Sequence, residues 1–95
     1  MDNMKDTFRK VIGGYAGKAL NGYSYLTTSP DETVFTVIAV GKIRGERFVN
    51  VGLVVRLIGE RIVVERDVNE KPLVDALMQA GIPQSQIVLA YGGEA

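Results

Sequence analysis

Apolar and polar residues alternate along residues 48–66, and this alternation is the strongest pattern in the chain. In its first half, apolar residues fall at every second position, which on a strand places their side chains on one face. The residues of this set are Val49, Val51, Leu53, Val55 and Leu57. Gly59 and Glu60 supply a turn, since glycine adopts positive φ at no steric cost, and Ile62 and Val64 resume the alternation. The pattern predicts a long β-hairpin.

The residues before this hairpin predict one helix and two further strands. Apolar residues at helical spacing form a stripe within residues 3–19, and they are Met4, Phe8, Val11, Ile12 and Tyr15. Residues 23–28 are rich in aromatic and β-branched side chains and predict a strand. After a turn at Pro30, residues 33–40 predict a second strand. Both of its faces are largely apolar, which indicates a central strand covered on both sides.

The residues after the hairpin predict a second helix and a last strand. Asp67 and Asn69 suit a helix start, while Gly81 suits the position just past the helix end and Pro83 a stop. Residues 87–91 are wholly apolar and predict a short buried strand. The element order is therefore α-β-β-β-β-α-β. We expect a single α+β domain over residues 1–95, with two helices and a mostly antiparallel five-stranded sheet whose last strand joins in parallel.

The composition excludes several kinds of chemistry. The chain of 95 residues has no cysteine and no histidine, so thiolate ligands, disulfides and a histidine general base are absent. Eleven basic residues balance eleven acidic ones, and a chain without net charge has no global field that draws it to DNA or to an anionic membrane. No apolar run approaches the ~20 residues that span a bilayer. We expect a cytoplasmic protein with no cofactor.

Three motifs from residue 40 onward resemble a known family. They are Val40-Gly41 before the hairpin, Glu65-Arg66-Asp67 at a strand end, and Ala80-Gly81-Ile82-Pro83 after the helix. In these residues the chain resembles the XisI family, the fdxN-element excision controlling factors of cyanobacteria and related bacteria. The chain departs from the family at Lys42, where an aromatic residue is usual, and after Tyr91, where a further tail is frequent.

The resemblance implies a role without catalysis. XisI proteins are linked to a DNA rearrangement as controlling factors and not as the recombinase, and they often accompany a XisH-type protein that looks like a nuclease-fold protein. The resemblance carries over no catalytic residue. The motif residues Glu65, Arg66, Asp67, Gly81 and Pro83 are thus left without a role. We predict a non-enzymatic accessory protein that acts by binding a XisH-like partner.

Two alternatives assign direct chemistry to side chains of this chain. Lys42, Arg44 and Arg47 surround a hairpin tip and are candidates for contacts to a partner or to the phosphates of DNA, although a solvated turn is the plainer interpretation. Glu65 and Asp67 are two residues apart on a strand, would face the same way, and are candidate ligands for the divalent metal of a small hydrolase. The plainer interpretation is that Asp67 caps the second helix while Glu65 pairs with an arginine.

Two surfaces are candidates for contacts between molecules. Tyr23 and Tyr25 share a strand face and could form a contact patch, or else pack at the edge of the core. Phe48 and Val54 fall on the less apolar face of the long hairpin strand, where one small chain has little to cover them. We expect a homo-oligomer, most simply a twofold dimer, that buries these two residues.

Overall fold

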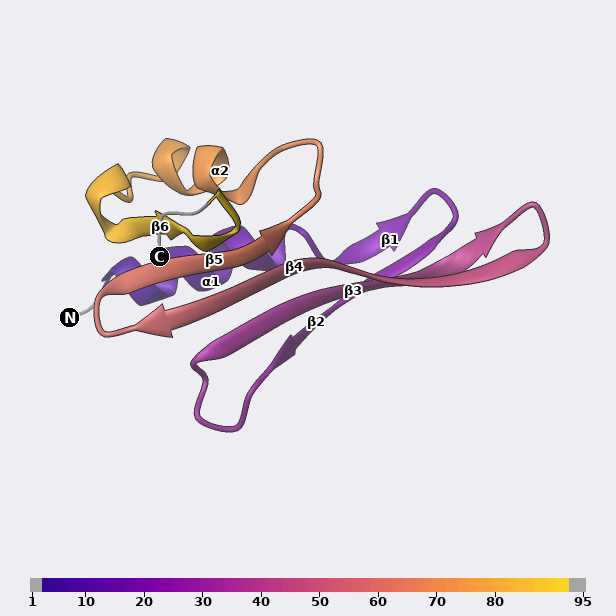
Figure 1. The fold of residues 1–95 in the computed structure, drawn as a ribbon, viewed down its shortest axis with the longest axis horizontal. Coiled ribbons are helices and arrows are strands. Elements are labelled where there is room, and N and C mark those ends of the chain that lie inside the picture. Colours follow the sequence, from indigo (N-terminus) through magenta and orange to yellow (C-terminus); the bar gives the residue numbers. More distant parts are fainter. Residues whose placement is uncertain (1–2, 93–95) are drawn as a thin grey trace.

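The computed structural model describes residues 3–92 and contains two α-helices packed on a six-stranded sheet (Figure 1). In chain order the elements are α1 (Asn3–Gly13), β1 (Gly17–Ala19), β2 (Gly22–Thr28), β3 (Val34–Ile43), β4 (Glu46–Ile58), β5 (Arg61–Asp67), α2 (Leu73–Gln79), η1 (Gln84–Gln86), β6 (Ile87–Leu89) and η2 (Ala90–Gly92), where η marks a short 3-10 turn. The order of strands in the sheet follows the chain from β1 to β6. Neighbours pair antiparallel, except β5 and β6, which are parallel.

The α+β class and the mostly antiparallel sheet are confirmed, but the sheet has six strands where five were expected. The additional strand is β1, which lies within the segment expected to extend the first helix. Helix α1 ends at Gly13, and a glycine inside a helix costs about 1 kcal/mol relative to alanine. Gly17 then adopts a φ of 126°, which is open to glycine, and begins the strand that pairs with β2.

Both helices pack on the same face of the sheet. Phe8 and Ile12 of α1 and Leu73 and Leu77 of α2 are fully buried in one core cluster. The sheet residues of this cluster are Phe35, Val37, Leu53, Val55, Leu57, Ile62 and Val64. We call the other side of the sheet the open face. Strand β3 is therefore covered by helices on one side only, and the expectation that both its faces are covered was wrong.

A β-bulge at Gly52 divides the long strand β4 into two parts. Val51 pairs with Ile38 and Leu53 pairs with Val37, so Gly52 has no opposite residue. One extra residue reverses the alternation of side chains between the two faces. Leu53 is accordingly fully buried beneath the helices, whereas Val51 is 37% exposed on the open face. The expectation that all alternate apolar residues of 49–57 share one face was wrong for those before the bulge.

Strands β3 and β4 continue past the helices as a projecting arm (Figure 1). We use "arm" for residues 39–50, which pair from Ala39 with Asn50 to Ile43 with Glu46. The arm helps to make the protein elongated, with extents of 45, 29 and 26 Å. At its tip Arg44 and Gly45 have φ values of 54° and 83°. Two successive positive φ angles are typical of the tight type I′ turn of a hairpin.

Helix α2 ends as the sequence predicts. Gly81 adopts a φ of 101°, and its N–H donates to the carbonyl of Met78 at 3.0 Å. The N–H of Ile82 donates to the carbonyl of Leu77 at 3.0 Å, which completes a Schellman motif with Ile82 buried. The last strand is shorter than expected, since a 3-10 turn begins at Ala90. Within residues 3–92, neither helix has the length and apolar character needed to cross a bilayer.

Candidate functional site

Glu65 belongs to an ion pair on the open face. It has no opposite residue in the pairing of β4 with β5, so it is the extra residue of a second bulge. Its Oε2 accepts a hydrogen bond from Nε of Arg56 at 2.8 Å. The two side chains are 34% and 48% exposed, and a pair this accessible to water contributes about 0–1 kcal/mol.

Asp67 has a different role at the start of α2. Its Oδ2 accepts a hydrogen bond of 2.6 Å from the backbone N–H of Leu73, the first residue of the helix. Its Oδ1 accepts hydrogen bonds from the backbone and side-chain nitrogens of Asn69 at 3.1 and 2.9 Å. The carboxylate therefore caps α2 and orders the connection from β5. Both parts of the plainer interpretation, a cap at Asp67 and an arginine partner for Glu65, are confirmed.

Glu65 and Asp67 do not converge on a common site. Asp67 is opposite Leu53 and lies on the helix-covered side, whereas Glu65 reaches Arg56 on the open face. The expectation that the two carboxylates face the same way was wrong, because the bulge at Glu65 breaks the alternation. Within the part of the chain that the structure describes, no three His, Cys, Asp or Glu side chains are grouped to hold a metal ion.

The three basic residues of the arm tip are exposed. Lys42 and Arg47 are opposite each other in the register of β3 and β4, so their side chains share the open-face side of the arm. Arg44 lies in the turn between them. The ion pairs found within residues 3–92 involve none of the three. The structure thus brings Lys42 and Arg47 together and leaves their charges available to another molecule.

The two tyrosines of β2 form a pair on the open face. Their ring centroids are 4.8 Å apart with an interplanar angle of 42°. Tyr23 is 45% exposed and Tyr25 is 52% exposed, opposite Val40 and Ile38 of β3. The shared strand face is confirmed, and both rings lie outside the core cluster.

Phe48 and Val54 are on opposite sides of the sheet. Phe48 pairs with Gly41 and Val54 pairs with Thr36, and these partners are an odd number of residues apart on β3. The bulge at Gly52 is the cause. Val54 faces the open side, and Phe48 lies on the helix-facing side of the arm, with its ring close to Gly41. The expectation that both residues share one face is corrected, while association itself stays a prediction.

The remaining motif residues have structural roles. Nε of Arg66 donates to the carbonyl oxygen of Val51 at 2.7 Å and so links β5 to β4 next to the bulge. Gly81 and Pro83 form the loop after α2 and line a cavity of about 310 Å³ together with Thr7 of α1. Sequence reasoning identified these positions but could not show what they contact.

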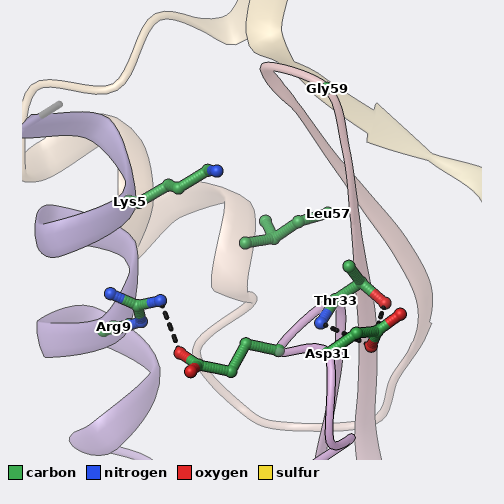
Figure 2. A pocket seen from close by; sticks show the side chains of 7 residues that line it. Lys5, Arg9, Asp31, Thr33, Leu57 and Gly59 are labelled. Atoms are coloured by element: carbon green, nitrogen blue, oxygen red, sulfur yellow. Dashed lines mark hydrogen bonds and ion pairs between the residues drawn. The ribbon is translucent and has the colours of Figure 1, made fainter.

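A polar hollow between α1 and the β2–β3 turn was not foreseen (Figure 2). It has a volume of about 370 Å³ and is lined by Lys5, Arg9, Asp31, Glu32, Thr33, Leu57 and Gly59. On one side of the hollow, Nη2 of Arg9 donates a hydrogen bond to Oε1 of Glu32 at 2.7 Å. The backbone of Glu32 has a φ of 59°. Two cationic and two anionic side chains line the hollow, so it favours neither anionic nor cationic ligands.

Asp31 organises the turn beside this hollow. Its Oδ1 accepts hydrogen bonds from the hydroxyls of Ser29 and Thr33 at 2.7 and 2.8 Å and from the N–H of Thr33 at 3.3 Å. These bonds, with that of Ser29 the largest influence, hold the pKa of Asp31 below its usual value. The Ser29-Pro30-Asp31 sequence indicates such a turn. The hydrogen bonds of Asp31 stabilise the turn, so we assign this residue a structural role.

Comparisons of the sequence and of the fold with known proteins identify similar proteins. The sequence matches the family model described as XisI protein over residues 1–95. No curated protein matches the chain. A crystal structure of a XisI-like protein from Anabaena variabilis ATCC 29413 superposes with a TM-score of 0.68 at 12% identity, covering 92% of this chain and 82% of the other.

A second similar structure is that of the fdxN element excision controlling factor XisI from the same organism. Its TM-score is 0.59 at 19% identity, and the match covers 93% of this chain and 79% of that one. At these identities the likeness to solved structures shows the shared fold. The match to the family model extends over the whole sequence. The chain therefore belongs to the XisI family.

Proposed function

We propose that this protein is a non-enzymatic accessory factor that takes part in the excision of a DNA element by binding a protein partner, a XisH-like protein. Family membership motivates the general role. The observation that carries partner binding is the arm, which extends beyond the helix-covered body (Figure 1). A cytoplasmic location is part of the proposal, because the excised element is DNA.

The arm tip has the features of a contact surface. Lys42 and Arg47 are exposed on the open-face side of the arm and Arg44 is exposed in the turn, whereas the half-exposed Ile43 lies on the helix-facing side, opposite Glu46. The three exposed cations match a partner surface that carries acidic residues. The short turn at Arg44 and Gly45 holds this surface in one conformation, which lowers the entropy lost on binding.

Co-purification with a XisH-like protein encoded beside this one tests the proposal. Arg44→Glu should weaken capture at least several-fold, because it reverses a charge at the tip without touching the core. Lys10→Glu on α1 makes the same change in net charge away from the arm and should leave capture unaltered. The proposal is wrong if the two purified proteins do not associate, or if both variants behave alike.

A second candidate is a small DNA-binding module that uses the same tip. The adjacency of Lys42 and Arg47 favours it, since two cations on one side of a hairpin can contact neighbouring phosphates. A mobility shift with long duplex DNA at about 50 mM salt, lost as the salt is raised, is the expected result. Absence of any shift at low salt excludes an autonomous activity of this kind.

A third candidate, a metal-dependent hydrolase, has the weakest support. Glu65 and Asp67 are separately engaged, with Arg56 and with the start of α2. A metal that bound to the native state would raise the melting temperature. We expect magnesium and manganese to leave the melting temperature unchanged, and a rise of several degrees would revive this candidate.

A further inference from the structure

Basic side chains are concentrated on the open face of the sheet. The register places six of the eleven basic residues there, all of them exposed: Lys18, Lys42, Arg47, Arg56, Arg61 and Arg66. Among the strand residues that the structure describes, Glu65 is the one acidic side chain that reaches this face, and it is paired with Arg56. The zero net charge of the chain therefore conceals a strongly positive face.

The six basic residues form two groups. The outer group, at the arm, is Lys18, Lys42 and Arg47, and the inner group, on the body of the sheet, is Arg56, Arg61 and Arg66. Along β3, Arg47 of the outer group pairs with Lys42, and Arg56 of the inner group pairs with Val34. Eight residues of strand at roughly 3.3 Å each therefore separate Arg47 from Arg56 by about 26 Å. The groups are thus too far apart to act on one small ion.

The surface between the two groups is aromatic and apolar. The half-exposed rings of Tyr23 and Tyr25 lie beside each other there. Val49 and Val51, 63% and 37% exposed, continue the surface on β4. Neither helix covers it, since both pack on the opposite side. A ligand for this face must bring negative charge to both ends and flat apolar groups to the middle.

We propose that the open face binds single-stranded nucleic acid, with phosphates at the two basic groups and unstacked bases against the Tyr23–Tyr25 pair. Aromatic side chains on an exposed sheet face stack on bases irrespective of their identity, and flanking cations follow the backbone. DNA and RNA strands share this chemistry.

Duplex DNA fits this face less well. Its bases are stacked on one another, so their flat surfaces are inaccessible to the tyrosine rings. A broad sheet face cannot enter a groove in the way a helix or a two-stranded ribbon does. The carboxylates of an acidic protein surface would pair with the cations. They offer no flat surface that could stack on the rings of Tyr23 and Tyr25. The ring pair between two basic groups therefore favours a single strand.

Fluorescence anisotropy with labelled oligothymidine and oligouridine of about 16 nucleotides tests the inference. We expect binding at about 50 mM salt that weakens steeply by about 200 mM, with a matched duplex bound more weakly than either single strand. The comparison of the two oligomers separates DNA from RNA as the preferred source. Equal or tighter binding to the duplex would overturn the inference, and so would a lack of binding to both single strands at the lower salt.

Three substitutions assign the binding to this face. Tyr25→Leu keeps an apolar side chain and removes a stacking ring, so affinity should fall about 5- to 150-fold. Arg61→Glu should weaken binding and reduce the slope of log affinity against log salt by about 0.7 or more, as expected for one lost phosphate contact. Lys10→Glu, with the same charge change on α1, should leave both quantities unchanged. Tyr23→Leu replaces Tyr25→Leu if circular dichroism shows that the latter is unfolded.

The test of nucleic-acid binding is independent of the test of partner binding at the arm tip. Arg61 and Tyr25 lie outside the arm, so their variants should still capture a XisH-like protein. The inference is wrong if Tyr25→Leu binds single strands as the parent does, or if Lys10→Glu weakens binding as much as Arg61→Glu. Neither result would bear on the capture experiment with Arg44→Glu.

Discussion

The carboxylate of Asp67 at the end of β5 accepts a 2.6 Å hydrogen bond from the backbone N–H of Leu73, six residues later, where α2 begins. The residue at the cap position itself is Pro72, which makes no side-chain capping bond. Asp67 therefore supplies from a distance what Ser, Thr, Asp or Asn supplies at most helix starts. The cap joins the sheet to the helix whose Leu73 and Leu77 complete the core.

Replacement of Asp67 by alanine should therefore destabilise the fold. A lost helix cap costs about 0.5–2 kcal/mol, and we expect the upper half of that range because Asn69 also loses its acceptor. Urea unfolding followed by circular dichroism measures the change. Glu70→Ala, at an exposed position in the same connection, is the matched control and should change the free energy of unfolding by under about 0.5 kcal/mol. Equal effects of the two changes would mean that Asp67 does not act as a cap.

Gly22 should tolerate no side chain. A Cβ atom there would overlap the backbone carbonyl of Val40 on the neighbouring strand, and backbone cannot move aside as a side-chain end can. Gly22→Ala should lower the free energy of unfolding by about 1–3 kcal/mol, the usual range for overpacking. Gly13→Ala is the control, since beyond its chain neighbours and the adjacent helix backbone no atom lies within 4 Å of its Cβ position. Thermal unfolding of both variants decides the matter, and a neutral Gly22→Ala would show that the sheet can adjust.

Asp31 should make stability depend on pH in acid. Its pKa is lower in the folded state than the ordinary value of 3.8, so the ionised carboxylate binds its partners better than the protonated one. This contribution is present above pH 3.8 and is lost as the pH falls through the lower folded-state pKa. The variant Asp31→Asn should lose less stability than the parent over that acidic range. Unfolding midpoints at a series of pH values measure the difference, and Glu60→Gln at an exposed turn is the control.

Sequence periodicity predicted most of the fold because most elements follow their local pattern. The hairpin, the second helix and its glycine end all lie where alternation, spacing and Gly81 indicated. The bulges at Gly52 and Glu65 could not be foreseen, because a bulge depends on how two strands pair and leaves no periodic signal in either one. A single extra residue then moved Val51 to the open face and separated Phe48 from Val54.

The candidate surfaces were predictable residue by residue but not as a set. Lys42 and Arg47 were recognised at the hairpin tip, and Tyr23 and Tyr25 on a strand. These four residues and Arg61 of another strand lie on the same side of the sheet. Only the register across the sheet shows this. Net charge was a poor guide for the same reason, since it sums over faces that another molecule meets separately.

Self-association should involve the helix-facing side of the arm. Phe48 and the half-exposed Ile43 are on that side, beyond the part of the sheet that the helices cover, whereas Val54 is on the open face. A twofold mate could cover such an apolar surface. Light scattering at low micromolar concentration should give about twice the 10.3 kDa of one chain.

Charge insertion on each side of the arm would locate the contact. Phe48→Lys should shift the measured mass toward the monomer, because it places a charge in the apolar contact, and Val54→Lys should leave the dimer intact. Circular dichroism must show that both variants are folded, since the Phe48 ring also packs close to Gly41. A mass near 10.3 kDa for the unaltered protein would rule out the dimer. Dissociation by Val54→Lys alone would move the contact to the open face, where it would compete with nucleic acid.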